Sequence, residues 1–300
     1  MTNDVESLIA EFRTITTSSI ELVFLKKYLP TNDKIFVNPI TGFVTSSRKM
    51  SAEDVAAYWS NTIFPDKSVE SYSANFPFAK ARLTYVVHTV ADFLNLNKKV
   101  GIKWCDFATG EGVLLQLISA FYPNIQVSGT EHSIELVKQL SGKGLDVKKL
   151  TLGSFSADDT GNKPDVSTLT WTLANAIDPV SCLKDIVLRT KMGGYVCVAE
   201  SSRILVPFRK SLKDYLSLTT PADIHPSHLS ANTLRCLMQL AGLEIVYTNR
   251  YFDSDVLLVI GRKVDYPIVP NYFDDQKSIV SFMEKWSEVS DYFEGIRNKL

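Results

Sequence analysis

The chain has 300 residues, of which 45% are hydrophobic and 22% are charged, so it is long enough to bury a sizeable core and has an ordinary globular composition. Its 32 Lys and Arg balance 33 Asp and Glu, and a formal net charge of −1 gives no global attraction to nucleic acid or to an anionic membrane. No apolar run approaches the roughly 18 residues of a membrane helix, and the N-terminus lacks the apolar core of a signal peptide. We therefore expect a cytoplasmic protein with no nucleic-acid and no membrane partner.

The four cysteines stand alone in the sequence, with no CxxC pair; they are Cys105, Cys182, Cys197 and Cys236. Isolated cysteines of this kind are typical of reduced, buried thiols. No metal site is expected.

Residues 1–75 are predicted to form a mainly helical accessory region. The segment SAEDVAAYW begins with a serine three residues before Asp54, which is the spacing of a helix cap. The segment KIFVNPITGFV is predicted to form a short hairpin or an irregular loop. A helix is predicted across about 76–97, because apolar residues recur there at three- and four-residue steps: Ala79, Leu83, Val86, Val87, Val90, Phe93 and Leu94.

From about residue 100 the chain alternates between short segments rich in β-branched residues and helix-like stretches. The segments are IKWCDF, IQVSGTE, VKKLTLGS, DVSTLTWTL and GYVCVAE. This alternation predicts a parallel sheet with helices on both faces. A further helix is expected to begin at Ser230 and to end at Gly242. The segments LEIVYTNRY and VLLVIGRKV then predict an antiparallel pair that completes the sheet.

The C-terminal segment 266–300 contains a separate amphipathic helix over 274–298. Its apolar stripe consists of Ile279, Phe282, Met283, Trp286, Val289, Phe293 and Ile296. Most stripes of this kind dock on their own domain, and we expect that here. The alternative is a contact with a second copy of the chain or with a partner protein.

The segment WCDFATGEG, residues 104–112, ends the first predicted parallel strand on Asp106 and continues into a loop with almost no side chains. Ligands bind at the carboxyl ends of strands in such sheets, and small residues let a backbone approach them closely. The loop lacks the GxGxxG of a dinucleotide site. The next strand ends on Glu131, which is placed to accept hydrogen bonds from ribose hydroxyls. Two acids at these positions suit a nucleoside that carries an ammonium group, and S-adenosylmethionine is such a molecule.

These motifs, followed in order by TLANAIDPVSCLKDI, KMGGYVCVAE and HPSHLSANTLRCLMQLAGLEIV, resemble class I S-adenosylmethionine-dependent methyltransferases. The resemblance covers roughly residues 70–262 and is closest to the branch that modifies sugars and other small molecules. It implies a Rossmann-like seven-stranded sheet, mostly parallel with the last strand antiparallel, over the domain 76–265. The cofactor-binding residues that it implies are Asp106, Ala108, Thr109, Gly110, Glu111, Gly112, Glu131, His132, Ser154, Phe155 and Thr170. Of these, Ser154 and Phe155 would lie near the adenine.

The sequence departs from the family pattern at three places. Ala108 replaces the first glycine of the loop. Ala174 and Asn175 stand where the family usually has Glu and His. The N-terminal region lacks the zinc-binding cysteine cluster of many sugar C-methyltransferases, so no metal is expected.

Candidates for the chemistry follow the fifth parallel strand. His225 and His228 lie there, and a histidine base could take a proton from the methyl acceptor, although a helix-capping or exposed role is the alternative. The loop 203–228 is expected to form much of the acceptor pocket. Candidate substrate-binding residues are Tyr72, Arg82, Arg203 and Arg209. Trp171 is read as packing.

The sequence therefore predicts in-line transfer of a methyl group to a small-molecule acceptor, with a sugar as one candidate. The acceptor and the choice between O-, N- and C-methylation stay open. Two alternatives remain: a catalytically inactive protein of this fold that binds a partner through the 274–298 helix, and a nicotinamide-dependent dehydrogenase, which the missing GxGxxG disfavours.

Overall fold

The computed structural model describes most of the chain. The described residues are 2–13, 15–29, 32–47, 54, 77–154, 163–201, 204–208, 211–216, 225–252 and 254–297. The helix predicted for SAEDVAAYW lies outside them, apart from Asp54.

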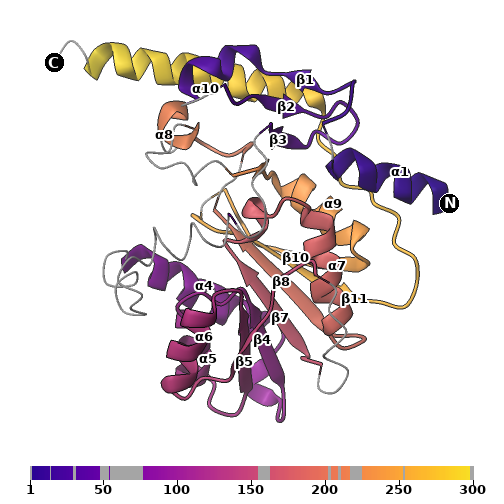
Figure 1. Ribbon diagram of the computed structural model, residues 1–300, viewed down its shortest axis with the longest axis vertical. Helices are drawn as coiled ribbons and strands as arrows, with labels where there is room; N and C mark the ends of the chain where they lie inside the picture. The colour runs from indigo at the N-terminus through magenta and orange to yellow at the C-terminus, as the bar shows by residue number, and fades with distance from the viewer. Residues whose placement is uncertain are drawn as a thin grey trace.

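The central sheet has seven strands in the order β10-β11-β8-β7-β4-β5-β6 (Figure 1). Strands β4 to β8 run parallel, and β11 is antiparallel to both of its neighbours, as predicted. From β4 the chain builds outward through β5 and β6, and then crosses to the other side of β4 for β7 and β8. The strand bounds are β4 Lys103–Phe107, β5 Gln126–Glu131, β6 Val147–Lys149, β7 Val166–Thr170, β8 Tyr195–Glu200, β10 Leu243–Thr248 and β11 Leu257–Lys263. The carboxyl ends of β4 and β7 therefore form the switch point at which open α/β sheets bind ligands.

Helices cover both faces of this sheet. On one face lie α4 (Pro77–Phe93), α5 (Val113–Phe121) and α6 (Ile134–Gly142) (Figure 1). Four residues of the stripe predicted for α4 and its C-terminal flank are buried there, namely Val86, Val87, Val90 and Leu94. The predicted helix is therefore confirmed.

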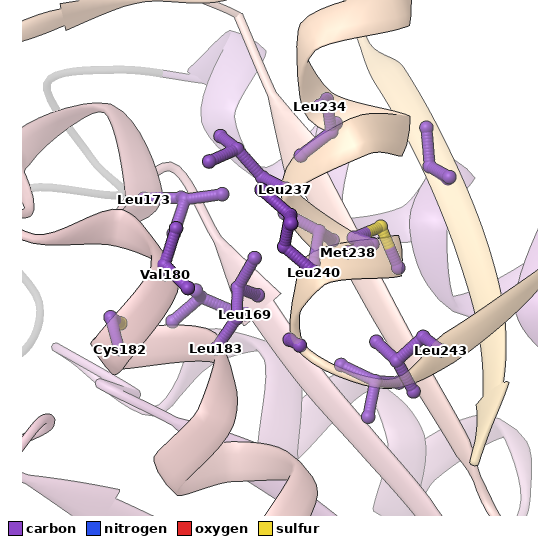
Figure 2. Close-up of a cluster of buried hydrophobic side chains, with 14 of the residues drawn as sticks. Leu169, Leu173, Val180, Cys182, Leu183, Leu234, Leu237, Met238, Leu240 and Leu243 are labelled. Carbon is purple, nitrogen blue, oxygen red and sulfur yellow. The ribbon is translucent and has the colours of Figure 1, made fainter. Parts of the chain in front are cut away.

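The other face carries α7 (Pro179–Arg189) and α9 (Ala231–Leu240). Figure 2 shows Leu183 and Val180 of α7 and Leu237 of α9 meeting over Leu169 of β7. All four cysteines are free and buried, as the sequence predicted. Ser230 caps α9, and its Oγ accepts a hydrogen bond from Thr233 N at 2.9 Å, so the predicted start of this helix is also confirmed.

A second, four-stranded sheet in the order β1-β2-β3-β9 lies beyond the carboxyl edge of the central sheet. Its strands are β1 Ile20–Glu21, β2 Ile35–Val37, β3 Val44–Ser46 and β9 Ser227–His228. The hairpin β2–β3 is the one predicted for KIFVNPITGFV. The region predicted to be mainly helical thus contributes three strands besides α1 (Thr2–Arg13) and the 3₁₀ helix η1 (Val23–Tyr28). The sequence signal for these strands is weak because each has only two or three residues.

Helix α10 (Gln276–Arg297) and the short α8 (Leu212–Leu216) pack on this second sheet (Figure 1). Ile279, Met283 and Trp286 of α10 are buried in that cluster, so the first half of the helix docks on its own chain as predicted. In the second half of α10, Ser290 is buried and Asp291 accepts a hydrogen bond from Tyr28, whereas Tyr292 is 66% and Phe293 60% exposed. We call β1–β3, η1, α8, β9 and α10 together the cap.

Asp274 joins the cap to α9. Its carboxylate accepts hydrogen bonds from Ser230 Oγ and from Asn232 Nδ2, the latter at 3.0 Å, while its backbone N–H donates to Thr41 O of the β2–β3 turn. Gly42 makes this joint possible, because its φ is +69° and a Cβ there would lie 2.6 Å from Asp274 Cβ. A single buried acid therefore connects the hairpin, the start of α9 and the start of α10.

We predict that Asp274→Ala lowers the free energy of unfolding by about 1–3 kcal/mol, because the substitution leaves buried hydroxyl and amide donors without their acceptor. Urea denaturation would measure the loss. The control is Asp265→Ala, which removes an exposed acid from the same connecting segment and should change stability by less than about 0.5 kcal/mol. Equal effects of the two substitutions would contradict this role of Asp274.

Candidate functional site

The loop after β4 turns through three left-handed residues, with φ of 54° at Ala108, 55° at Gly110 and 73° at Gly112. The position of Gly112 favours glycine because its φ is in the left-handed region and because a Cβ there would lie 2.8 Å from Leu140 Cδ2, which would have to shift. A Cβ at Gly110 would meet no atom within 4 Å, and the backbone there therefore borders open space. Ala108 adopts the same conformation at a cost of about 1–2 kcal/mol. The loop thus exposes bare backbone to a ligand.

Glu131, at the tip of β5, holds this loop in place. Its carboxylate accepts hydrogen bonds from Gly110 N at 2.9 Å and from Ser133 N at 3.0 Å, through different oxygens. Each carboxylate oxygen has a second lone pair available for a ligand hydroxyl. Glu131 can therefore bind a ribose while it fixes the glycine loop.

Asp106 lies beneath the loop and is only 1% exposed. Its Oδ1 accepts a hydrogen bond from Thr168 Oγ1 at 2.6 Å, and Trp104 Nε1 donates to the same hydroxyl at 3.2 Å. Burial raises the pKa of Asp106 to about 7, the Thr168 hydrogen bond opposes that rise, and the negative charge of Glu131 adds to it. The group therefore changes its charge state close to neutral pH.

The loop after β6, where the resemblance places the adenine, is held from two sides. His132 Nδ1 and Thr151 Oγ1 share a hydrogen bond of 2.8 Å. Gly153 N donates to Asp185 Oδ2 of α7 at 3.0 Å, and Asp185 also accepts from Arg189 Nε at 3.0 Å. Sequence reasoning missed Asp185. Its only signal is an acid and an arginine four residues apart among the buried positions of α7.

A turn after β7 forms the other side of the switch point. Thr170 ends β7, and the 3₁₀ helix η4 (Leu173–Asn175) follows it. Asn175 Oδ1 and His225 Nδ1 are 2.7 Å apart, so the structure brings together the position that departs from the family pattern and one predicted base.

Glu200, the last residue of β8, supports this turn from beneath. It is 1% exposed and accepts a hydrogen bond from Ala174 N at 3.2 Å. Burial raises the pKa of Glu200 to about 7, against the lowering effect of the backbone N–H groups of the turn. Sequence reasoning missed it, although an acid that ends a buried strand is the same signal as Asp106.

The remaining predicted residues are spread more widely. His228 lies in β9, buried in the cap, with Nδ1 3.0 Å from Tyr215 Oη and with Val44 as its cross-strand partner. Arg82 lies on α4, with its guanidinium 3.9 Å from Asp255. Thr109 and Glu111 are buried in the glycine loop, and Ser154 Oγ donates to Thr151 O at 2.7 Å. The predicted residues outside the described ranges are Tyr72, Phe155, Arg203 and Arg209.

The arrangement fits S-adenosylmethionine. Open space over Gly110, a carboxylate with free lone pairs at Glu131 and a fixed loop after β6 follow one another along the carboxyl edge. Within the described ranges, no three His, Cys, Asp or Glu side chains gather closely enough to hold a metal ion. No helix within those ranges is long and apolar enough to cross a membrane.

This fold and this site define an S-adenosylmethionine-dependent methyltransferase of class I. Residues 78–248 match the profile of a family described as a methyltransferase domain, and because that stretch is more than half of the chain, the protein belongs to this family. The nicotinamide-dependent alternative is therefore set aside.

Two curated relatives match a shorter stretch. The demethylmenaquinone methyltransferase of Paenarthrobacter aurescens (strain TC1) is 27% identical over 128 residues, which are 42% of this chain and 50% of that protein. The ubiquinone/menaquinone biosynthesis C-methyltransferase UbiE of Bdellovibrio bacteriovorus is 28% identical over 123 residues, which are 40% of this chain and 52% of that protein. The chain thus spans about half the length of the curated relatives it matches.

Two solved structures share the fold. The CurJ carbon methyltransferase superimposes with a TM-score of 0.54 at 13% identity, over 69% of this chain and 61% of that one. An S-adenosylmethionine-dependent methyltransferase from Thermotoga maritima superimposes with a TM-score of 0.50 at 16% identity, over 70% of this chain and 99% of that one. At these identities the likeness concerns the fold alone.

We predict that Glu131→Ala weakens binding of S-adenosylhomocysteine at least tenfold, or about 1.4 kcal/mol, because hydrogen bonds to a charged group are lost and the glycine loop is released. Calorimetric titration would measure the change. Glu135→Ala, an exposed acid on the following helix, is the matched control and should bind as wild type does. Unchanged affinity in Glu131→Ala would rule out the ribose role.

The pKa values of Asp106 and Glu200 predict how stability depends on pH. Both carboxyls have a pKa of about 7 in the folded chain, against about 4 in an unfolded one. The folded protein therefore binds more protons between these values. Each group's contribution is complete below pH 4, and the free energy of unfolding falls by up to about 1.4 kcal/mol per pH unit per group as pH rises toward 7.

Urea denaturation at several pH values between about 5 and 8 would measure this slope. Asp106→Asn should remove the contribution of one of the two groups and so flatten the dependence. A variant with the wild-type slope would show that Asp106 titrates normally.

Proposed function

We propose that the protein transfers the methyl group of S-adenosylmethionine to a small-molecule acceptor by in-line displacement, with His225 as general base. The residues that we expect to bind the cofactor lie at the ends of β4 and β5 and in the loop after β6, which leaves the ends of β7 and β8 for the acceptor. The cap lies beyond that edge of the sheet (Figure 1). Holding donor and acceptor at about 3 Å in line can supply several kcal/mol of the barrier.

The hydrogen bond between Asn175 and His225 carries the assignment of the base. An amide oxygen can only accept, so Nδ1 of His225 carries the proton and Nε2 is the basic nitrogen. The pair therefore supports an acceptor that must lose a proton, a hydroxyl or a carbon acid, since a neutral amine hardly needs a base. His228 is buried in the cap against Tyr215, and we assign the base role to His225 for that reason.

The names of the two curated relatives suggest which acceptor to test first. Both are named for quinone biosynthesis, and one is named a C-methyltransferase. A reduced demethylmenaquinone has an activated ring carbon and adjacent hydroxyls, which suits a histidine base. We therefore infer an oxygen-bearing metabolite as the acceptor, with this quinol tested first and sugar hydroxyls next. Arg82 is proposed to contact the acceptor.

The second half of α10 supports a further role in contacts with a second copy or a partner protein. Its exposed apolar residues are Val289, Tyr292, Phe293 and Ile296. A catalytically inactive scaffold would keep this surface too, but the intact Glu131 and Asn175–His225 contacts favour an enzyme.

We predict that His225→Gln lowers kcat about 100-fold or more and removes the acidic limb of the pH–rate profile, because the base is lost. S-adenosylhomocysteine affinity should stay unchanged, since His225 lies on the acceptor side. Transfer of labelled methyl to reduced demethylmenaquinone, and then to sugars, would be the assay. The control is His88→Gln, which changes a histidine of α4 that bonds Tyr122. Full activity in His225→Gln would exclude it as the base.

A further inference from the structure

Trp171, directly after β7, has an unusual backbone. Its φ is 51°, in the left-handed region that a bulky side chain rarely adopts. Its backbone N–H nevertheless continues the ladder by donating to Ala199 O at 2.8 Å. Such a conformation costs about 1–3 kcal/mol and persists only where the surroundings enforce it.

The surroundings of Trp171 do enforce it. Thr172 Oγ1 donates to Thr170 O at 3.0 Å, and Asn175 Nδ2 donates to Trp171 O at 3.4 Å. From beneath, the buried carboxylate of Glu200 accepts from Ala174 N. These hydrogen bonds lock the turn on both sides of the tryptophan, so the strain is maintained by the turn as a whole.

The side chain of Trp171 ends in a buried N–H donor without an acceptor. Its indole Nε1 has no hydrogen-bond partner in the structure described, although the ring packs against the cluster under α4. A buried donor left unsatisfied costs about 1–3 kcal/mol. Packing alone, which is the interpretation that the sequence favours, does not account for that cost. A ligand oxygen would remove it.

A second buried donor of this kind is Nε of Arg82, on the face of the sheet that α4 covers. The register of the strands places Arg82 at the same edge of the sheet as Trp171. Thr170 pairs with Ala199, Glu200 pairs with Leu257, and Asp255, which faces the Arg82 guanidinium, precedes that strand by two residues. Trp171 and Arg82 therefore lie on one face of the sheet, at one edge.

The position of Trp171 and Arg82 in the sheet indicates which ligand they would contact. The ribose and adenine residues lie on the β5–β6 side of β4, whereas Trp171 and Arg82 lie on the β7–β8 side. We propose that the Trp171 indole N–H, together with Arg82 Nε on the same face of the sheet, binds an oxygen of the methyl acceptor: a carbonyl, phenol or carboxylate oxygen next to the atom that is methylated. This subsite rests on the proposed function, because it takes the β7–β8 side as the acceptor side.

Proton–nitrogen NMR of protein labelled at its four tryptophans tests the subsite without knowledge of the acceptor. The signal of Trp171 is assigned from its absence in Trp171→Phe, which keeps an aromatic ring and removes the donor. The protein, loaded with S-adenosylhomocysteine, is titrated to about 5 mM with acetophenone, phenol and benzoate, which carry the three kinds of oxygen, and with toluene, which carries none.

We expect at least one oxygen-bearing probe to move the Trp171 indole proton downfield and toluene to leave it in place. Trp171→Phe should weaken the binding of that probe about fivefold or more, because one hydrogen bond is lost, and should leave cofactor affinity unchanged. Trp286→Phe, which alters an indole in the cap, is the matched control and should bind the probes as wild type does. Arg82→Met provides a second test. It should weaken the binding of benzoate and leave the indole signal of Trp171 where it is in the folded wild-type protein.

Three results would overturn the inference. A downfield shift on addition of S-adenosylhomocysteine alone would assign the N–H to the cofactor. Equal shifts with toluene, or no shift with any oxygen-bearing probe, would remove the oxygen subsite. Calorimetry separates these results from the larger proposal, since a protein that binds S-adenosylhomocysteine but shows no probe shift loses only this subsite, and one that binds no cofactor loses both.

Discussion

The parallel pairing of β4 with β5 on one side and β7 on the other is the constraint on which the site depends. Asp106 pairs with Gly129 in one ladder and with Thr168 in the other. Because the three strands run in the same direction and in this register, they end together, and the loops that follow them meet at one edge. The glycine loop, the tip of β5 and the turn after β7 are therefore neighbours.

Three carboxylates hold the loops of this edge, and those of Asp185 and Glu200 are buried. Glu131 accepts from the glycine loop, Asp185 accepts from Gly153 in the loop after β6, and Glu200 accepts from Ala174 in the turn after β7. Each acid comes from a strand end or a helix of the core, and each accepts a hydrogen bond from the backbone of a loop or turn at the sheet edge. A buried carboxylate is costly unless hydrogen bonds satisfy it, and loop amides need acceptors, so one contact meets both requirements. The loops are thereby fixed before a ligand arrives.

The cap is built from segments that lie far apart in the chain. The N-terminal hairpin, the segment before α9 and α10 form one small sheet-and-helix unit, which Asp274 connects to α9. His228 and Tyr215 belong to the interior of this unit, whereas His225, three residues earlier, reaches Asn175 of the central domain. Two histidines that are only three residues apart in sequence therefore have different surroundings. His228 lies inside the cap, and His225 lies where the cap meets the central domain.

Local patterns were sufficient for the central domain. Short segments rich in β-branched residues between helix-like stretches predicted its strands, and three- and four-residue spacing of apolar residues predicted α4 and α9. The acids at the ends of β4 and β5 indicated the cofactor edge. The roles of Asp185 and Glu200 and the strain at Trp171 were not predicted, because each depends on which backbone N–H or carbonyl lies beside it. Of the small sheet, only the β2–β3 hairpin was among the predictions, because strands of two or three residues acquire their meaning only from the strands that they pair with. The sequence by itself thus determined the fold class and the cofactor, through short-range periodicity and strand-end chemistry. Only the tertiary structure decided which histidine meets Asn175, because that contact joins segments that are 50 residues apart.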